Sequence, residues 1–479
     1  MIRKPEIIQH PLFKTIGKCA DKLNMNAFVV GGWVRDCILH RDTKELEFDI
    51  VCDDDGVKLA TSVAQELKIK NINIYKTFGT AAINYKEIKL EFNGARQESY
   101  IESSRNPIVK KGTIEDDQKR RDFTINAMSV RLNKHNFGEF IDPFNGIGDI
   151  KKKIIKTPLD PLKTYNDDPL RMMRAIRFAS ILEFNIETKS IEAIKINNDR
   201  IQIIKQERIT EELNKIILSK KPSIGIKLLS ETGLLKHFFP EFELLRGVDN
   251  INGITHKDNF YHTLKVLDNV SEKNASLWLR WAAILHDIAK PKTKKFDKKN
   301  GWTFHGHEFI GSKMVHPIFK RLKLPLNEQR KYVQKIVLLH LRPISLTKDI
   351  VTDSAIRRLL FDAQNDIEDL MLLCEADITS KNEKKVTKYK NNLHLVVQKL
   401  KKVEAEDKIK NWRPPINGDI IMKKLGMQGG KSNPSEGKKI AFIKQKITDA
   451  ILDGEIKNNY KEATKMMYIV ADELGIKYK

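Results

Sequence analysis

Residues 28–36 read FVVGGWVRD, and LEFDIVC follows at residues 46–52. The first stretch predicts a buried strand, a turn at Gly31 and Gly32, and a helix whose first turn carries Arg35. Glycines at such a turn let backbone N–H groups approach a phosphate group, and a nearby arginine can neutralise its charge. A tight strand–helix connection that binds nothing would use the same residues, so this stretch alone leaves both interpretations open.

The stretch at residues 46–52 alternates apolar side chains with the carboxylates Glu47 and Asp49. Because successive side chains of a strand point to opposite faces, both carboxylates would lie on one face. The stretch IKLEFNGA at residues 88–95 repeats the pattern and can add Glu91 from a neighbouring strand. Carboxylates arranged in this way suit a Mg²⁺ ion that also binds phosphate oxygens. The alternative is that they are solvated faces of two half-exposed strands.

The charge balance points to the kind of partner. The 479 residues include 86 Lys and Arg and 63 Asp and Glu, a formal charge of +23, which excludes an acidic disordered chain and favours a polyanion. Hydrophobic residues make up 41%, enough for the cores of several domains. No apolar stretch has the length of a membrane span and no signal peptide is apparent, so we expect no membrane partner. Four cysteines without close spacing indicate reduced thiols and a cytoplasmic location.

Strand-like and helical stretches alternate to about residue 150, and helical patterns continue from there. We therefore expect an α+β fold with a head made of a small mixed sheet and helices, followed by an elongated all-helical body. The lysine face of the C-terminal part would hold a polyanion, close against the body or simply face solvent. The expected divisions are a head at residues 1–150, a helical neck at 151–240, a third domain at 241–385 and a basic helical tail at 386–479.

Two further motifs identify a family resemblance. Residues 119–127 read KRRDFTINA, and residues 167–171 read DDPLR. With the glycine turn and the paired carboxylates, they resemble the nucleotidyltransferases of the DNA polymerase β superfamily, in particular the class II tRNA CCA-adding enzymes and the bacterial poly(A) polymerases. The resemblance implies a polymerase-β-like head that binds Mg²⁺ and a nucleoside triphosphate. In the family the first motif contacts the sugar and the triphosphate, which here points to Arg121, Asp122 and Asn126 as nucleotide-binding residues.

The second motif implies base recognition in the neck. In the family its second acid and its arginine read the incoming base, which here points to Asp168 and Arg171, with Arg174 continuing the same basic face. A spacing of three residues places the first two on one helix face, where an acceptor and a donor can address one base edge. Asp168 would equally suit an ordinary helix cap. One departure is Glu47, because the family usually has aspartate there and catalytic geometry is sensitive to the shift of one methylene.

A second constellation lies in the expected third domain. LRWAAILHDIAKP at residues 279–291 is an apolar helix that ends on an adjacent His–Asp pair, and buried polar groups need partners. With the histidines and the aspartate around it, the pair resembles the HD metal-dependent phosphohydrolases, whose transition metal (Mn, Ni, Co, Fe or Zn) activates a bound water. An HD fold without a metal is the alternative. The ligands that the resemblance implies are His262, His286, Asp287, His307, His340 and Asp377.

The resemblance implies a tRNA nucleotidyltransferase that adds CCA to tRNA 3′ ends from CTP and ATP, without a nucleic-acid template. Glu47, Asp49 and Glu91 would act through Mg²⁺, tRNA would be the partner, and no protein partner is indicated. An accessory phosphohydrolase activity would belong to the HD segment. A poly(A) polymerase, or an enzyme that adds only CC or A, shares the head motifs and is the near alternative. The alternative of another class is an HD phosphohydrolase whose weakened head only binds RNA.

Overall fold

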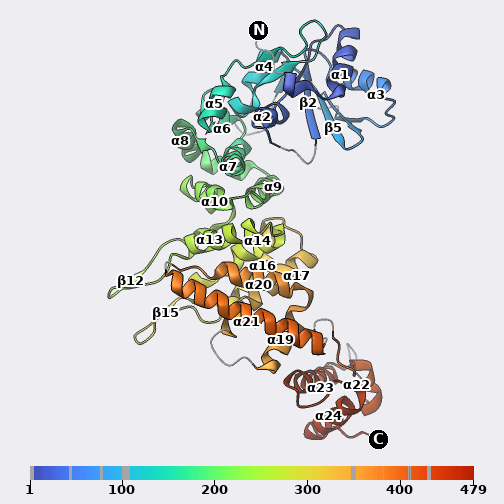
Figure 1. Ribbon diagram of the computed structural model, residues 1–479, viewed down its shortest axis with the longest axis vertical. Coiled ribbons are helices and arrows are strands. Elements are labelled where there is room, and N and C mark those ends of the chain that lie inside the picture. The colour runs from blue at the N-terminus through green and yellow to red at the C-terminus, as the bar shows by residue number, and fades with distance from the viewer. Residues whose placement is uncertain are drawn as a thin grey trace. The chain divides into compact units, whose positions relative to one another are not determined.

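The computed structural model in Figure 1 is folded into helices and strands over most of its length. The chain forms two compact units, Met1–Glu243 with Arg321–Lys323 and Leu244–Lys320 with Leu324–Lys479. The structure describes residues 5–41, 46–75, 79–99, 108–346, 352–380, 382–407, 409, 412–428 and 433–478.

The first unit contains a seven-stranded mixed sheet in the order β3-β4-β5-β2-β1-β8-β9. The strands β2 and β5 pair in parallel, and the other neighbours pair antiparallel. Phe48 and Ile50 of β2 and Leu90 and Phe92 of β5 are completely buried, which agrees with the predicted alternation. The strands are β1 Ala27–Val30, β2 Leu46–Cys52, β3 Asn73–Tyr75, β4 Thr80–Tyr85, β5 Ile88–Gly94, β8 Ser129–Arg131 and β9 Phe140–Ile141.

Helices and a second small sheet complete the head. The helix α1 (Pro11–Lys22) packs against α3 (Gly56–Glu66), and α3 covers β4 and β5. The helix α2 (Gly32–Ile38) begins directly after β1, as FVVGGWVRD predicts. The α+β head with a mixed sheet is therefore confirmed. Its remaining elements are the 3-10 turns Pro5–Ile8 and Thr124–Asn126, the paired strands β6 Arg96–Ser99 and β7 Ile108–Lys111, and the helices α4 Ile114–Lys119 and α5 Gly146–Lys152.

Helices after the head form the rest of the first unit. The helix α7 (Leu170–Leu182) packs against α9 (Gln206–Ile217) and α10 (Pro222–Glu231). Asp168 lies between α6 and α7 in an extended conformation, because a residue that precedes proline disfavours the helical region. The other elements here are α6 Pro161–Asp167, α8 Thr188–Asn197, the 3-10 turn Asn198–Ile203, α11 Leu235–Phe238, α12 Pro240–Glu243 and the paired strands β10 Ile154–Ile155 and β11 Asn185–Ile186.

The second unit is mainly helical. The apolar helix α14 (Leu277–Leu285) packs against α13 (Asn259–Glu272) and α17 (Glu328–Leu339). Near the C-terminus, α22 to α24 share a separate core that includes Ile443 and Met467. The other helices are α15 Lys290–Thr293, α16 His307–Arg321, α18 Leu341–Ser345, α19 Asp353–Ala363, the 3-10 turn Gln364–Asp366, α20 Ile367–Asp377, α21 Glu383–Asp407, α22 Gly418–Leu425, α23 Pro434–Asp453 and α24 Tyr460–Glu473.

The expectation of an all-helical body was wrong in detail. Two hairpins interrupt the helices of the second unit, β12 (Asn250–Ile251) with β13 (Ile254–Thr255) and β14 (Lys295–Asp297) with β15 (Gly301–Thr303). The first hairpin turns at an Asn–Gly pair, and both of these residues have a positive φ (52° and 80°). Asn–Gly favours this two-residue hairpin turn, so the signal was present in the sequence. The body is largely helical, with short two-stranded sheets.

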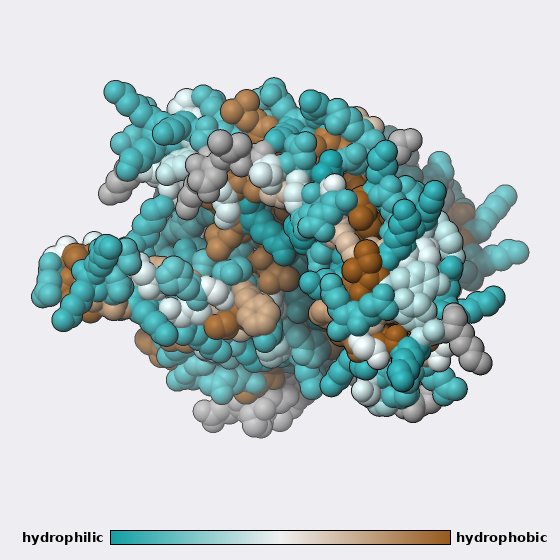
Figure 2. Space-filling view, turned by 90° about the horizontal axis from the view of Figure 1, so that it is seen from below, coloured by the Kyte–Doolittle hydropathy of each residue, from teal (hydrophilic) through white to brown (hydrophobic). Residues whose placement is uncertain are grey.

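The surface reflects the high charge. On the face shown in Figure 2 hydrophilic residues predominate, and apolar residues appear in separate groups between them. None of the helices in the described part of the chain combines the length and the apolar character that a membrane crossing requires.

Candidate functional site

The first group of predicted site residues lies on β2 and β5. The parallel register of these strands places Asp49 opposite Glu91 and Glu47 opposite Lys89. These side chains share one face of the sheet, because they alternate with the buried apolar side chains on both strands. The structure therefore brings the three predicted carboxylates to one face.

A lysine that the sequence interpretation did not include joins this group. The Nζ atom of Lys89 lies 2.6 Å from Glu47 Oε1 and 2.5 Å from Glu91 Oε1. The sequence does indicate that Lys89 lies beside Glu91, because it precedes Glu91 by two residues and alternate residues of a strand share a face. These ion pairs raise the pKa of Lys89, so its ammonium stays charged at neutral pH.

The third carboxylate, Asp49, lies against the glycine turn. Burial raises its pKa to about 6, the positive charge of Arg121 opposes this shift, and the negative charge of Glu91 adds to it. Gly31 has a φ of 77°, and a Cβ atom there would lie 3.1 Å from Asp49 Oδ2 and 3.1 Å from Arg121 Nη1. Glycine is thus required both by the backbone conformation and by the close approach of two charged groups. Gly32 follows as the first residue of α2.

A hydrogen-bonded network connects α2 to the RRDFTINA segment. Arg35 Nη1 donates to Asn126 Oδ1 (2.7 Å), and its other nitrogens bind both carboxylate oxygens of Asp36 (2.9 and 2.7 Å). Asn126 Nδ2 donates to Asp122 Oδ1 (3.0 Å). Arg35, Asp122 and Asn126 are all buried, so the network fixes the predicted nucleotide-binding residues of two segments relative to each other.

The same network extends to the neck. Arg174 Nε of α7 donates to Asp122 Oδ2 over 2.7 Å. Burial alone would raise the pKa of Asp122, but the charge of Arg174 and the hydrogen bond from Asn126 outweigh burial and lower it to about 2. Asp122 is therefore ionised at neutral pH, and it ties α7 to the head.

The arginines of the RRDFTINA segment depend on a buried acid that the sequence interpretation missed. Asp117 is completely buried. Its Oδ1 accepts from Arg120 Nε (2.9 Å), and its Oδ2 accepts from Arg121 Nε (3.0 Å). The available signal was the spacing of three and four residues between Asp117 in α4 and the two arginines that follow this helix. Asp117 thus orients Arg121 towards Asp49.

The two residues expected to read the base lie at the start of α7. Asp168 Oδ1 accepts a hydrogen bond from the backbone of Leu170 (3.1 Å), which is the capping contact that the sequence offered as an alternative. Arg171 Nη2 donates to the backbone oxygen of Arg120 (2.8 Å). Both side chains remain partly exposed. Base recognition by Asp168 and Arg171 stays a prediction.

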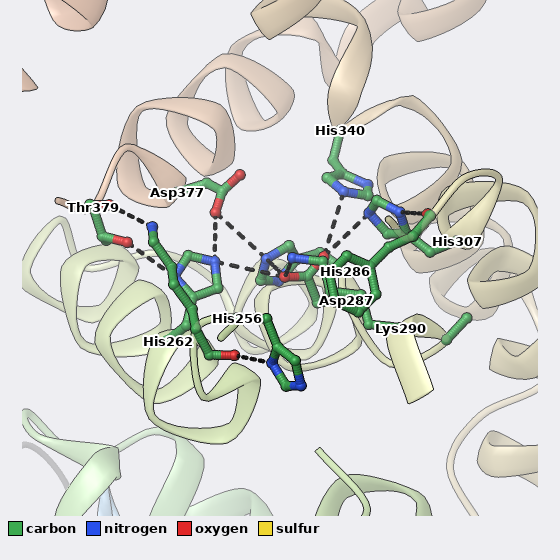
Figure 3. Close-up of polar contacts among 12 residues, drawn as sticks. His256, His262, His286, Asp287, Lys290, His307, His340, Asp377 and Thr379 are labelled. Carbon is green, nitrogen blue, oxygen red and sulfur yellow. Dashed lines mark hydrogen bonds and ion pairs between the residues drawn. The ribbon is translucent and has the colours of Figure 1, made fainter. Parts of the chain in front are cut away.

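The second group of predicted residues converges in the second unit, where Figure 3 shows its histidines and aspartates facing one another. Asp287 is central to it. Its Oδ2 atom lies 3.2 Å from His286 Nε2 and 3.5 Å from His262 Nε2, and its Oδ1 atom lies 3.2 Å from His307 Nε2. The residues of the cluster lie in five helices or directly after them. These helices are α13, α14, α16, α17 and α20.

Two further residues complete the cluster. Asp377 Oδ1 lies 2.9 Å from His262 Nε2, and His340 Nε2 lies 4.0 Å from Asp287 Oδ1. Candidate ligand atoms within 4.8 Å of one another form two sets that share Asp287, one with His262 and His286 and one with His307 and His340. All six residues predicted as HD ligands are therefore together.

The hydrogen bonds of the imidazoles suit metal binding. The Nδ1 atoms of His286, His307 and His340 each lie 2.7 Å from a backbone oxygen, and this orientation turns each Nε2 atom inwards. Among the described residues, these three Nε2 atoms and Asp287 Oδ2 are buried without a hydrogen-bond partner. Buried polar atoms without partners are costly, so the cluster fits a cation that the chain would bind.

The pKa values of two histidines in the cluster are shifted in opposite directions. Burial lowers the pKa of His340 to about 4, with the charge of His286 acting in the same direction. Burial also acts to lower the pKa of His286, but the carboxylates of Asp287 and Asp377 outweigh burial and raise it to about 10. Lys290 Nζ, which the sequence interpretation missed, lies 2.6 Å from Asp287 Oδ2 at ion-pair distance but without hydrogen-bond geometry.

Comparison with known families matches three parts of the chain. A "Poly A polymerase head domain" matches residues 27–156. A "Probable RNA and SrmB- binding site of polymerase A" matches residues 183–245. An "HD domain" matches residues 259–382. The first and third matches cover the carboxylates of β2 and β5 and the histidine–aspartate cluster, whereas Asp168, Arg171 and Arg174 lie between the first two matches.

Several curated proteins are similar to the chain. The "Multifunctional CCA protein" of Pseudoalteromonas atlantica is 31% identical over 309 residues, which cover 63% of this chain and 72% of that protein. The "A-adding tRNA nucleotidyltransferase" of Deinococcus radiodurans is 29% identical over 326 residues, which cover 66% of this chain and 72% of that protein. A solved tRNA nucleotidyltransferase in complex with a primer tRNA and an incoming ATP analogue aligns with a TM-score of 0.57 at 21% identity, covering 81% of this chain and 99% of that one, which indicates a shared fold.

Proposed function

The chain belongs to the class II tRNA nucleotidyltransferases, the family of CCA-adding and A-adding enzymes with a poly(A) polymerase head and an HD domain, and we propose that it adds CCA to tRNA 3′ ends. Its substrates would be tRNA, CTP and ATP, and no nucleic-acid template would take part. The observation that carries this proposal is the parallel pairing of β2 and β5, which gathers Glu47, Asp49 and Glu91 on one face of the sheet, with Asp49 against the turn at Gly31.

The three carboxylates of the head would hold Mg²⁺. A bound Mg²⁺ supplies charge neutralisation at the phosphates in phosphoryl transfer. The tRNA 3′ hydroxyl attacks the α-phosphorus of the nucleotide, a phosphodiester bond forms, and the bond to the leaving pyrophosphate breaks. Arg121, directed by Asp117 towards Asp49, is placed to bind the triphosphate, and the backbone at Gly31 and Gly32 can approach it closely.

The network of Arg35, Asn126 and Asp122 would hold the ribose and orient the neck. Arg174 joins Asp122 to α7, so Asp168 and Arg171 at the start of that helix would stand at a fixed place relative to the sugar. A nucleotide base in that place would find an acceptor just before α7, at Asp168, and a donor in the first turn of α7, at Arg171. Choice between CTP and ATP would then arise from hydrogen bonds to the base edge.

One assay separates the proposal from its alternatives. The purified protein is incubated with tRNA that lacks CCA and with CTP and ATP, singly and together, and the product ends are sequenced. CC from CTP and CCA from both nucleotides are expected. Addition of A alone, of CC alone or of long A tracts would assign the chain to the partial enzymes or to the poly(A) polymerases. No addition of any kind would contradict the transferase proposal.

A second activity is supported by the convergence of imidazole nitrogens and carboxylate oxygens in the second unit, four of which are buried without a hydrogen-bond partner among the described residues. We propose that His262, His286, Asp287 and Asp377 bind a transition metal (Mn, Ni, Co, Fe or Zn), and that His307 and His340, with the shared Asp287, bind a second ion or a phosphate. A bound metal of this kind can supply an activated water. Its substrates would be phosphoesters, such as 2′,3′-cyclic phosphates or small phosphomonoesters. Elemental analysis of protein purified without chelator, followed by hydrolysis assays with each metal added, tests both statements.

The functional division of the chain completes the proposal. Residues 1–150 would form the transferase head, residues 151–240 the base- and RNA-binding neck, residues 241–385 the phosphohydrolase-like domain and residues 386–479 a basic tail. The charge of +23 supports binding of tRNA by several of these parts. Affinity for tRNA should therefore fall steeply as the salt concentration rises.

A further inference from the structure

The ammonium of Lys89 occupies a central place among the carboxylates of the head. It lies within 2.6 Å of one oxygen of Glu47 and within 2.5 Å of one oxygen of Glu91. The side chains of Glu47 and Lys89 are 52% and 48% exposed, and that of Glu91 is 32% exposed. Two of the three carboxylates that would bind a divalent ion are thus already paired with a cation of the chain itself.

The strand register explains why this contact forms. Glu47 and Lys89 are direct partners in the parallel ladder, and Lys89 and Glu91 are two residues apart on β5. All three side chains therefore leave the sheet on one face. Glutamate at position 47 has one methylene more than the aspartate usual in the family, and the longer side chain reaches the ammonium of Lys89. Glu47, which departs from the family pattern, is thus in direct contact with Lys89.

We propose that Lys89 is a positioning residue of the head, which holds Glu47 and Glu91 and competes with the divalent ion for their oxygens. A cation that enters between these carboxylates must displace the ammonium, because two positive charges at one place repel each other. The head would therefore bind its ion weakly until a nucleotide is present, since the triphosphate supplies further oxygen ligands to the ion. The inference rests on the proposed transferase site.

Binding of Mn²⁺ without nucleotide tests this role directly. Free Mn²⁺ is measured by electron paramagnetic resonance in titrations of the wild-type protein, Lys89→Met and Lys86→Met. Lys86 lies on the same hairpin, 5.5 Å from the ring of Tyr85, and among the described residues the ion pairs of Glu47 and Glu91 are made by Lys89, so replacing Lys86 removes an equal charge from outside that group. Each titration is repeated with Asp49→Ala added to the same protein. An ion bound in the head is then recognised because its binding is lost with Asp49.

Lys89→Met should tighten the Asp49-dependent Mn²⁺ site about tenfold or more, because it removes a unit charge in contact with two ligands. Lys86→Met should change the same affinity by less than about threefold, since an exposed charge farther away is screened. In the double variant Lys89→Met with Glu91→Gln, most of this increase in Mn²⁺ affinity should be lost. The Mg²⁺ concentration that gives half-maximal CTP incorporation should fall in Lys89→Met.

The outcomes distinguish two kinds of failure. Equal Mn²⁺ affinities in Lys89→Met and Lys86→Met would overturn the role of Lys89 and leave the transferase site intact. Absence of an Asp49-dependent ion in every variant would contradict the proposed transferase site and this inference together. Lys89 is half-exposed, so Lys89→Met should fold, and its thermal melting transition is recorded beside that of Lys86→Met.

Discussion

Arg174 donates a hydrogen bond over 2.7 Å to Asp122, a residue 52 positions earlier in the chain. Arg174 lies in α7, the helix that also carries Arg171, and Asp122 lies in the segment expected to bind the sugar. Asp122 also accepts from Asn126, which in turn accepts from Arg35. One buried carboxylate therefore links the helix after the glycine turn to the start of the neck.

This link makes a prediction about acid stability. The pKa of Asp122 is lowered to about 2 from a usual value of 3.8, so its stabilising contribution is complete above about pH 4. The contribution is lost as the pH falls from about 4 to 2, because the proton binds more readily in the unfolded chain. Asp122→Asn should lower the free energy of unfolding by about 2 kcal/mol at pH 7 and by much less at pH 2. Denaturant titrations at both pH values measure the difference.

A double-mutant cycle checks the source of that stability. Asp122→Asn, Arg174→Met and the double variant should show a coupling of about 1–3 kcal/mol, since the two groups are in contact. Additive losses would mean that Arg174 does not stabilise the ionised carboxylate.

The carboxylates make a prediction about catalysis. Asp49→Ala should abolish nucleotide addition and leave tRNA binding nearly unchanged, because Asp49 would bind the metal ion and not the RNA. Glu47→Asp should keep or raise the rate if Glu47 takes the place of the usual aspartate. Single-turnover assays and filter binding measure the two effects. Turnover of Asp49→Ala at the wild-type rate would remove Asp49 from the catalytic group.

The glycine turn offers a test with a matched control. Gly31→Ala introduces a Cβ atom 3.1 Å from Asp49 Oδ2 at a φ of 77°, so it should reduce nucleotide addition by at least about tenfold and destabilise the first unit by about 1 kcal/mol. Gly253→Ala has a similar φ of 80°, but no atom of the described residues lies within 4 Å of its added Cβ. The control should show the backbone strain alone, with normal activity. Melting curves and addition rates of both variants are compared.

The start of α7 tests base recognition against capping. If Asp168 and Arg171 read the base, Asp168→Ala and Arg171→Ala should damage the choice between CTP and ATP more than they damage folding. If Asp168 only caps the helix through Leu170, its variant should lose about 1 kcal/mol of stability and keep the order of nucleotides. Sequencing of the added ends, together with thermal melting, distinguishes these results.

The cluster in the second unit should act independently of the head. His286→Ala with Asp287→Ala should remove bound transition metal and any phosphohydrolase activity, while CTP and ATP addition continues. His307→Ala is the comparison, because it should remove no more than one of two ions that share Asp287. Metal content by elemental analysis gives the result. Unchanged metal in the double variant would show that the cluster is not the binding site.

The local features of the head could be predicted from the sequence. Alternation at residues 46–52 and 88–95 depends only on the period of a strand, and it correctly placed Glu47, Asp49 and Glu91 on one face. The turn at Gly31 followed from two glycines between an apolar stretch and a helix. The turn signal at Asn252 and Gly253 was equally local, but it was not used to predict a hairpin.

Other features were decided by the tertiary structure. Lys89 meets Glu47 only because β2 and β5 pair in parallel in one register, and a shift by one residue would turn the side chains of one strand to the opposite face. Asp117 acquires its role through complete burial, which its acidic surroundings in the sequence do not reveal. The histidines come from segments up to about 80 residues apart, so motif spacing suggested the set, but only helix packing turned each Nε2 atom inwards. Periodicity is a property of neighbouring residues, whereas register, burial and imidazole orientation depend on contacts between distant ones.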